Sequence, residues 1–241
     1  MPDANDAGTA AVYANGIYTS LRARIVEGDI PPETRLNIDA ISRESGISQT
    51  PVREALQRLE GDGLVVSQPA RGYSTTPMLD LDGLTSLFEF RFLIEPWTAR
   101  AAAVDTLTNP APELEHEIET FQKAIDEGGD IRREMLTHDT RFHNAIIAAS
   151  RNPTVAQAYL QTHCHLHVFR LYSVDLDGSE TMAEHRAIWE AVRDCRPDDA
   201  ETLMAQHIKH SFRRSSAAFP AGAENAGMFG GQPPRRPSMA G

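Results

Sequence analysis

The chain has 241 residues, of which 41% are hydrophobic and 24% are charged, a composition typical of a globular protein. No apolar run approaches the ~20 residues that a helix needs to cross a bilayer. The N-terminal segment lacks the basic and apolar pattern of a secretory signal. The two cysteines, Cys164 and Cys195, are too few and too far apart for a disulfide framework or a thiolate metal site. We therefore expect a cytoplasmic protein that makes no membrane contact.

The net charge of −11 at pH 7 disfavours non-specific affinity for nucleic acid, but the charge is unevenly distributed. Residues 1–78 carry seven basic side chains against ten acidic ones, whereas residues 79–241 carry 16 against 24. All seven basic residues of the first part are arginines, whose planar guanidinium suits bidentate contacts with phosphate and guanine. The N-terminal third can therefore present a local DNA-binding face.

Three helices and a β-hairpin are predicted in this N-terminal third, after a lead over residues 1–10 that we expect to be disordered. The predicted elements are a helix from Val12 to Val26, a short helix from Leu36 to Gly46, a helix from Ser48 to Gly61 and a β-hairpin over residues 64–76. Glycines end each helix, and Pro31-Pro32 forms a rigid connector between the first two. Residues 11–77 are therefore predicted to form a winged helix-turn-helix domain.

The remainder of the chain is predicted to be helical up to a Gly-, Pro- and Ala-rich tail. Apolar periodicity and turn signals predict helices over residues 80–104, 112–127, 130–150, 153–173, 179–194 and 197–216. Short loops between about six helices favour an antiparallel all-α bundle over residues 78–216. Residues 217–241 are expected to be disordered. The predicted fold class is therefore mainly α.

The start of the third helix has the residues of a DNA-reading element. The residues that anchor this helix on the domain core are Val52, Ala55, Leu56 and Leu59. Ser48, Gln49, Thr50 and Arg53 are left at the exposed N-terminal end, which in such domains enters the major groove. Gln49 suits an adenine edge, Arg53 suits a guanine or a phosphate, and the hydroxyls suit phosphate oxygens. Arg71, at the hairpin tip, is a candidate for the minor groove or flanking phosphates.

The alternative for these residues is structural. In this alternative, Ser48 does no more than cap the helix, and Arg53 is a solvated charge. Spacing alone leaves both readings open.

Three segments resemble the GntR family of bacterial transcription regulators. They are residues 30–36 (IPPETRL), 46–56 (GISQTPVREAL) and 59–65 (LEGDGLV). The remainder resembles the FadR-type subgroup, whose C-terminal FCD domain is an all-helical effector-binding bundle. The resemblance implies that Ser48, Gln49, Thr50 and Arg53 read the operator. Many relatives carry arginine at the position of Gln49, so the operator sequence of a relative does not transfer to this chain.

Four polar side chains on inward-facing helix positions point to a metal site. Asp139 and His143 are spaced i, i+4 and share one helix face, while His185 and His207 lie on the apolar stripes of two other helices. A single inward histidine is more often a hydrogen-bonded core residue, but three with an aspartate favour a divalent ion. The resemblance implies the same site, since related FCD domains carry an Asp-x-x-x-His and two single histidines. Zinc is the expected ion, with nickel, manganese or iron as alternatives.

Four protein ligands leave one or two positions open on an octahedral ion, and a small carboxylate effector can occupy them. Arg91 is the candidate anion contact, because it shares a predicted helix face with Glu95. The alternatives are an internal Arg91–Glu95 salt bridge or a link to the DNA-binding domain.

The remaining histidines receive no site role. The alternating run His163, His165 and His167 places no two imidazoles on one helix face. The histidines expected to be solvated are His116, His138 and His210.

These features predict a homodimeric regulator, not an enzyme, with two winged domains docked on a short pseudo-palindromic operator of double-stranded DNA. Repression relieved by an effector is the outcome that the resemblance implies, and the sign is not fixed by the sequence. Candidates for the dimer contact are Phe88, Phe92 and Trp97. The alternatives are a metal-dependent, hydrolase-type enzyme and a direct metal sensor.

Overall fold

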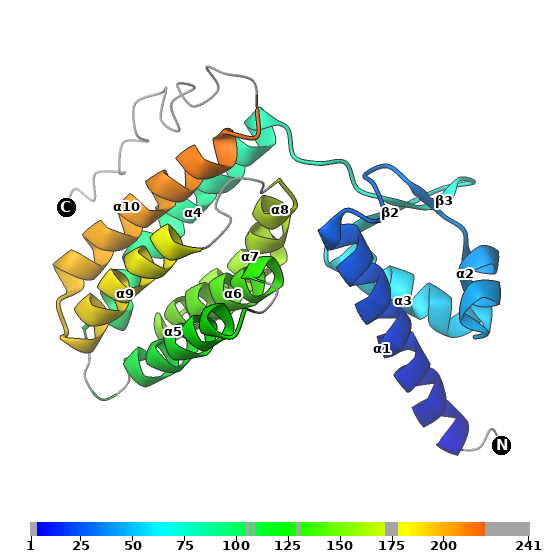
Figure 1. The fold of residues 1–241 in the computed structure, drawn as a ribbon, viewed down its shortest axis with the longest axis horizontal. Coiled ribbons are helices and arrows are strands. Elements are labelled where there is room, and N and C mark those ends of the chain that lie inside the picture. Colours follow the sequence, from blue (N-terminus) through cyan, green and yellow to red (C-terminus); the bar gives the residue numbers. More distant parts are fainter. Residues whose placement is uncertain (1–3, 105–106, 108, 129–130, 172–177, 220–241) are drawn as a thin grey trace, which may run out of the picture. The chain divides into compact units, whose positions relative to one another are not determined.

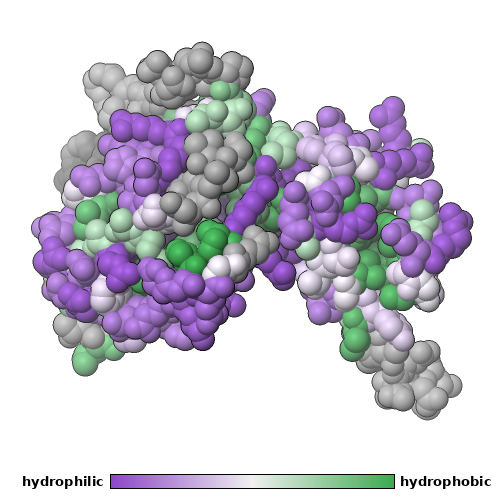
Figure 2. Space-filling model, in the orientation of Figure 1, coloured by the Kyte–Doolittle hydropathy of each residue, from purple (hydrophilic) through white to green (hydrophobic). Residues whose placement is uncertain are grey.

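The computed structural model describes residues 4–104, 107, 109–128, 131–171 and 178–219. The chain divides into two compact units, residues 1–78 and residues 79–241, called here the N-terminal and C-terminal units. Hydrophilic side chains cover most of the face of each unit seen in Figure 2, and smaller apolar patches lie among these side chains. Among the described residues, no helix combines the length and the apolar composition that a membrane-spanning segment requires.

The N-terminal unit contains three helices and a small sheet (Figure 1). Its elements are α1 (Ala4–Glu27), β1 (Arg35–Leu36), α2 (Ile38–Ser45), α3 (Gln49–Gly61), β2 (Val65–Gln68) and β3 (Gly72–Thr75). The strands are antiparallel in the order β1-β3-β2, with Leu36 opposite Tyr73 and Val66 opposite Ser74. The β2–β3 hairpin is the predicted wing, so the winged helix-turn-helix fold is confirmed.

Buried apolar residues of α1 and α3 form the core of this unit. They are Ile17, Leu21 and Ile25 from α1, and Val52, Ala55, Leu56 and Leu59 from α3. Gly46 follows α2 at φ +70°, a left-handed conformation that ends the helix and that glycine adopts without strain. The tight turn between α2 and α3 therefore rests on this glycine.

Two local predictions for this unit differ from the structure. Leu36 belongs to β1 and not to the second helix, because its backbone pairs with β3 and its side chain is buried. α1 begins at Ala4, so part of the lead that we expected to be disordered is helical. The alanines Ala4, Ala7 and Ala10 favour this extension.

Within the described residues of the C-terminal unit, all the regular secondary structure is helical (Figure 1). They are α4 (Leu81–Ala102), α5 (Ala111–Asp126), α6 (Ile131–Ala149), α7 (Pro153–Gln161), α8 (Cys164–Leu171), α9 (Ser179–Arg193) and α10 (Pro197–Ser216). α4 lies antiparallel to α10 and also contacts α6, while α9 contacts α10 and α5. The interior between these helices holds one large apolar cluster, which includes Phe88, Phe142, Ile188 and Ile208. The predicted helical bundle is confirmed.

The helix predicted over residues 153–173 is in fact two helices. α7 ends at Gln161, and His163 has φ +45°, in the left-handed region that interrupts a helix. The Thr162 hydroxyl donates a hydrogen bond to the Tyr159 carbonyl at 2.6 Å, which supports the turn. Residues 172–173 and, from residue 220 onward, the predicted tail lie outside the described residues.

Candidate functional site

Three helices of the C-terminal unit bring the four predicted metal ligands together. α6 carries Asp139 and His143, α9 carries His185 and α10 carries His207, and one ligand-type atom from each lies within 4.8 Å of all the others. Asp139 Oδ1 lies 3.6 Å from His143 Nε2 and 3.6 Å from His185 Nε2. His185 Nε2 lies 3.4 Å from His207 Nε2. Two ligands of one tetrahedral zinc ion, each bound at ~2.0–2.1 Å, are separated by roughly 3.4 Å, so this spacing suits a single ion.

The surrounding core fixes the imidazole rings. The rings of Phe142 and His185 stack with centroids 4.0 Å apart and an angle of 2° between their planes. His143, His185 and His207 are at most 2% exposed, whereas Asp139 is partly exposed. Burial of this kind excludes alternative rotamers, so the three rings are held toward a common point.

Each imidazole has a polar partner at its Nδ1 atom. The contacts are His143 with Glu95 Oε2 at 2.5 Å, His185 with His138 Nε2 at 2.9 Å, and His207 with Glu184 Oε2 at 2.7 Å. Metal-binding histidines in proteins characteristically use their second nitrogen in this way, which fixes the tautomer. All three Nε2 atoms are thereby directed to the space near Asp139.

Both ring nitrogens of His143 are buried, and neither makes a hydrogen bond of regular geometry among the described residues. Nδ1 is nevertheless in close contact with Glu95 Oε2, whereas Nε2 lies 3.6 Å from Asp139 Oδ1. A buried polar atom without a partner costs free energy. A cation at the common point of the four side chains would supply the missing partner, so these residues fit a divalent ion.

The electrostatics of the site favour the unprotonated form of Asp139, His185 and His207. Burial lowers the pKa of His185 well below its ordinary value, and it lowers the pKa of His207 to about 4. Burial would raise the pKa of Asp139, but His165 and His143 outweigh it and hold this pKa well below its ordinary value. At His143, burial would lower the pKa, but the carboxylates of Glu95 and Asp139 outweigh it and raise this pKa above its ordinary value. Neutral imidazoles and an ionised carboxylate are the forms that bind metal ions.

Glu184 is a carboxylate that the sequence analysis missed. It accepts hydrogen bonds from Arg214 Nη2 at 2.9 Å and contacts His210 Nδ1 at 2.8 Å, in addition to His207. Burial would raise its pKa, but the bonds from His207 and Arg214 lower it to about 2. Glu184 directly precedes the proposed ligand His185 on α9 and contacts the proposed ligand His207 on α10. It therefore connects the two helices that carry these ligands.

The prediction that His138 is solvated is wrong. Its side chain is 2% exposed, its ring stacks on Phe121 at 4.7 Å, and its Nδ1 lies 3.1 Å from the Glu117 carbonyl oxygen. The error has a simple cause, since His138 is spaced i, i+4 from Phe142 and therefore shares its inward face. His165 is also buried, and its Nδ1 lies 2.5 Å from Asp139 Oδ2.

Arg91 forms the internal salt bridge that the sequence left open as an alternative. Its Nε lies 2.6 Å from Glu95 Oε1, and both side chains are 1% exposed. Its Nη2 has no hydrogen-bond partner among the described residues. Contact between Arg91 and an effector stays a prediction.

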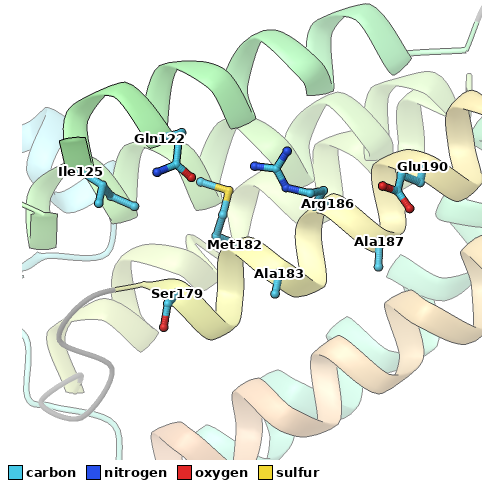
Figure 3. A pocket seen from close by; sticks show the side chains of 8 residues that line it. All are labelled: Gln122, Ile125, Ser179, Met182, Ala183, Arg186, Ala187 and Glu190. Carbon is cyan, nitrogen blue, oxygen red and sulfur yellow. The ribbon is translucent and has the colours of Figure 1, made fainter.

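Two hollows differ in their relation to the four ligands. A cavity of about 40 Å³ is lined by Asp139, His165, His207, Met135, Leu136, Val168, Phe169, Thr181 and Ser211. A larger, open groove of about 500 Å³ lies between α5 and α9, and none of the four ligands lines it (Figure 3). Because two of the four proposed metal ligands line the small cavity, it is the better candidate for binding a small molecule at the metal, despite its size.

The predicted DNA-reading residues lie at one end of α3. Ser48, Gln49, Thr50 and Arg53 are exposed, whereas Pro51 and Val52 between them are buried. Gln49 Nε2 donates a hydrogen bond to Asp39 Oδ1 of α2 at 2.5 Å.

Ser48 is the N-cap residue by position, but its side chain makes no capping hydrogen bond. Its hydroxyl is therefore not committed to the helix end. Arg71 is exposed in the turn that joins β2 to β3.

Family models match both units. The model for bacterial regulatory proteins of the gntR family matches residues 13–74, and the model for the FCD domain matches residues 86–210.

Known proteins are similar to almost the whole chain. The HTH-type transcriptional regulator YdhC of Bacillus subtilis (strain 168) is 26% identical over 220 residues, which cover 88% of this chain and 95% of the relative. The galactonate operon transcriptional repressor of Escherichia coli (strain K12) is 26% identical over 220 residues, which cover 82% of this chain and 94% of the relative.

A solved GntR transcriptional regulator from Rhodococcus sp. RHA1 has a similar fold. It superposes with a TM-score of 0.70 at 19% identity, covering 86% of this chain and 98% of that one. This likeness concerns the fold alone. Together with the two family matches and the relatives, the domain order identifies the chain as a member of the GntR family of transcription regulators with an FCD domain.

Proposed function

We propose that the protein is a homodimeric transcription regulator whose operator affinity is controlled by a small organic acid bound at a divalent metal in the C-terminal unit. The observation that carries this proposal is the convergence of Asp139, His143, His185 and His207 in a unit that follows a winged helix-turn-helix. An effector that binds one arrangement of a protein more tightly than another shifts the population between them. DNA affinity then changes by the coupling free energy between the two sites.

On the DNA side, the exposed end of α3 carries the proposed base contacts. Arg53 and Gln49 are assigned to base edges, and Ser48 and Thr50 to phosphate oxygens. Arg71 in the wing is assigned to the minor groove or to flanking phosphates. All five side chains are exposed, and this accessibility supports the assignment.

On the effector side, three imidazole nitrogens and one carboxylate oxygen would hold the ion, and zinc suits this donor set best. When bound, the ion supplies the positive charge that attracts a carboxylate. Met135, Leu136, Val168 and Phe169 give the adjoining cavity apolar walls, while Thr181 and Ser211 add hydroxyls to its lining. This lining matches the chemistry of a short acid with a small apolar body, which needs the lining side chains to move because the cavity is only about 40 Å³.

For dimerisation, we propose the exposed apolar face of α4. Leu93 is 61% exposed and Trp97 is 45% exposed, and the two lie one helical turn apart. Phe88, a candidate from the sequence, is fully buried in the core and cannot contact a second copy. Phe92 is partly buried against the same core.

A direct metal sensor is the second candidate, favoured by the size of the cavity. A cavity needs roughly 10–15 Å³ for each water molecule, so about 40 Å³ holds only a few waters unless its side chains move. In this version the ion itself is the signal. The similarity to regulators over almost the whole chain supports either version over a metal-dependent hydrolase.

The test is selection of binding sites from a random duplex DNA pool by purified full-length protein, with zinc present and with zinc chelated. We expect enrichment of a two-fold symmetric sequence, and a panel of short organic acids should change its affinity for the zinc-loaded protein. A response to zinc with none to any acid would favour the direct sensor. Absence of an enriched sequence in both conditions would contradict the regulator.

A further inference from the structure

A hydrogen-bonded network behind the metal ligands uses residues that bind no metal. Glu95 from α4, Tyr159 from α7 and His165 from α8 form it, and they are called here the outer ring. Their side chains are 1%, 1% and 5% exposed, so water does not share their hydrogen bonds.

The outer ring begins and ends at the two ligands of α6. His143 Nδ1 lies 2.5 Å from Glu95 Oε2. The Tyr159 hydroxyl donates to Glu95 Oε1 at 2.9 Å and lies 2.8 Å from His165 Nε2, and His165 Nδ1 lies 2.5 Å from Asp139 Oδ2.

The direction of each bond follows from the donors. Tyr159 has one proton and gives it to Glu95, so its oxygen accepts from His165. His165 then donates at both nitrogens, to Tyr159 and to Asp139. Arg91 Nε also donates to Glu95 Oε1, so this oxygen accepts two hydrogen bonds, while Glu95 Oε2 is in close contact with His143 Nδ1.

We propose that the outer ring positions Asp139 and His143 together, so that one oxygen of Asp139 and Nε2 of His143 face the ion. This inference rests on the proposed metal binding. With Oδ2 held by His165, Asp139 has only Oδ1 to offer a metal, and with Nδ1 held by Glu95, His143 keeps a single ring orientation. The ring also links α4, which supplies no ligand, to α6 through α7 and α8.

The break between α7 and α8 gains a role from this arrangement. Tyr159 and His165 lie on either side of the break, at Thr162 and His163, and the His163 φ of +45° turns the chain there. In an uninterrupted helix, a spacing of six residues would place these two side chains on different faces. The turn lets both reach the same carboxylate network.

The test is the zinc affinity of Tyr159→Phe in the full-length protein, measured by competition with a chromophoric chelator. The variant keeps the buried ring and removes only the hydroxyl, so we expect zinc affinity to fall roughly 10- to 100-fold. The matched control is Tyr18→Phe, which removes a hydroxyl that donates to Asp62 at 2.6 Å in the N-terminal unit and should leave zinc affinity unchanged.

A second readout separates positioning from mere packing. In His165→Phe, Asp139 Oδ2 is released and can also bind the ion, so the visible absorption of the cobalt(II)-loaded protein should weaken as the coordination number rises. His165→Asn, which keeps an N–H near the Nδ1 position, should restore part of the wild-type spectrum. Zinc affinities and cobalt spectra equal to those of the wild type would overturn the proposal. If the wild-type protein itself binds no zinc, both the proposed metal site and the positioning role of the outer ring are contradicted.

Discussion

Arg53 is exposed on α3 while its neighbours Val52 and Ala55 are buried, so its side chain is held on the outer face of the helix. If it reads a base, Arg53→Ala should weaken operator binding by about 1–3 kcal/mol and relax the preference at one position of the selected sequence. A DNA titration at fixed salt measures both effects. Arg193→Ala, which removes an exposed arginine from the C-terminal unit, should leave affinity unchanged. Equal titrations for Arg53→Ala and the wild type would refute the base-reading role.

His185 is the most enclosed of the proposed ligands, with no exposed surface and a stacked phenyl ring. His185→Ala should lower the metal content and the metal-dependent part of the thermal stability together, because an ion that binds the folded state stabilises it. Elemental analysis and thermal unfolding, each with and without zinc, give the two quantities. His116→Ala, an exposed histidine on α5, is the control. A full complement of metal in His185→Ala would remove His185 from the site.

The four proposed ligands could be found from the sequence because each lies on a helical stripe with a regular period. Asp139 and His143 share a face by their i, i+4 spacing, and His185 and His207 are flanked by apolar residues at helical intervals. His138 and Glu184 were missed, although each also lies next to a ligand on its own helix. Their roles depend on helices that approach from other parts of the chain, and spacing within one helix does not report such contacts.

At the scale of single helices, the N-caps of α2 and α3 differ in a testable way. The Asn37 side chain accepts a hydrogen bond from the Ala40 amide at 3.1 Å, whereas Ser48 makes no such bond. Asn37→Ala should therefore lower the free energy of unfolding by about 1 kcal/mol, and Ser48→Ala should lower it by much less. Chemical denaturation of the two variants measures the difference. Equal losses would show that the Ser48 hydroxyl does cap α3 in solution.

The boundaries of the helices were predicted best where glycine or proline marks them. Gly46 before α3 and Pro197 at the start of α10 lie where the sequence placed them. The break at Thr162 and His163 contains neither glycine nor proline, and the apolar pattern continues across it. The sequence therefore wrongly predicted a single helix there. The cause of the break is tertiary, since the turn brings His165 against Asp139 of α6.

At the scale of the whole molecule, the proposed dimer predicts a specific weakness on α4. Trp97→Glu places a charge on the exposed apolar face beside Leu93, and burying that charge between two copies is costly. Analytical ultracentrifugation should show a dimer for the wild type and a monomer for Trp97→Glu. Val12→Glu, at an apolar position of the N-terminal unit that is 70% exposed, should remain dimeric. A Trp97→Glu variant that stays dimeric would place the interface elsewhere.

The order of the two units was accessible from the sequence because each has its own signature. Three segments around α3 resemble one family in the same order, and the helical periodicity begins after Pro77. The proposed dimer surface could not be selected from the sequence, since the sequence pattern did not separate buried Phe88 from exposed Leu93 on the same helix.

The metal content of the purified full-length protein tests the account most directly. Elemental analysis should find about one divalent ion per chain, as expected for one four-ligand site. Chelation should lower the unfolding temperature and added zinc should restore it. Protein that is free of metal as purified, and whose unfolding temperature does not respond to zinc, nickel, manganese or iron, would contradict the account.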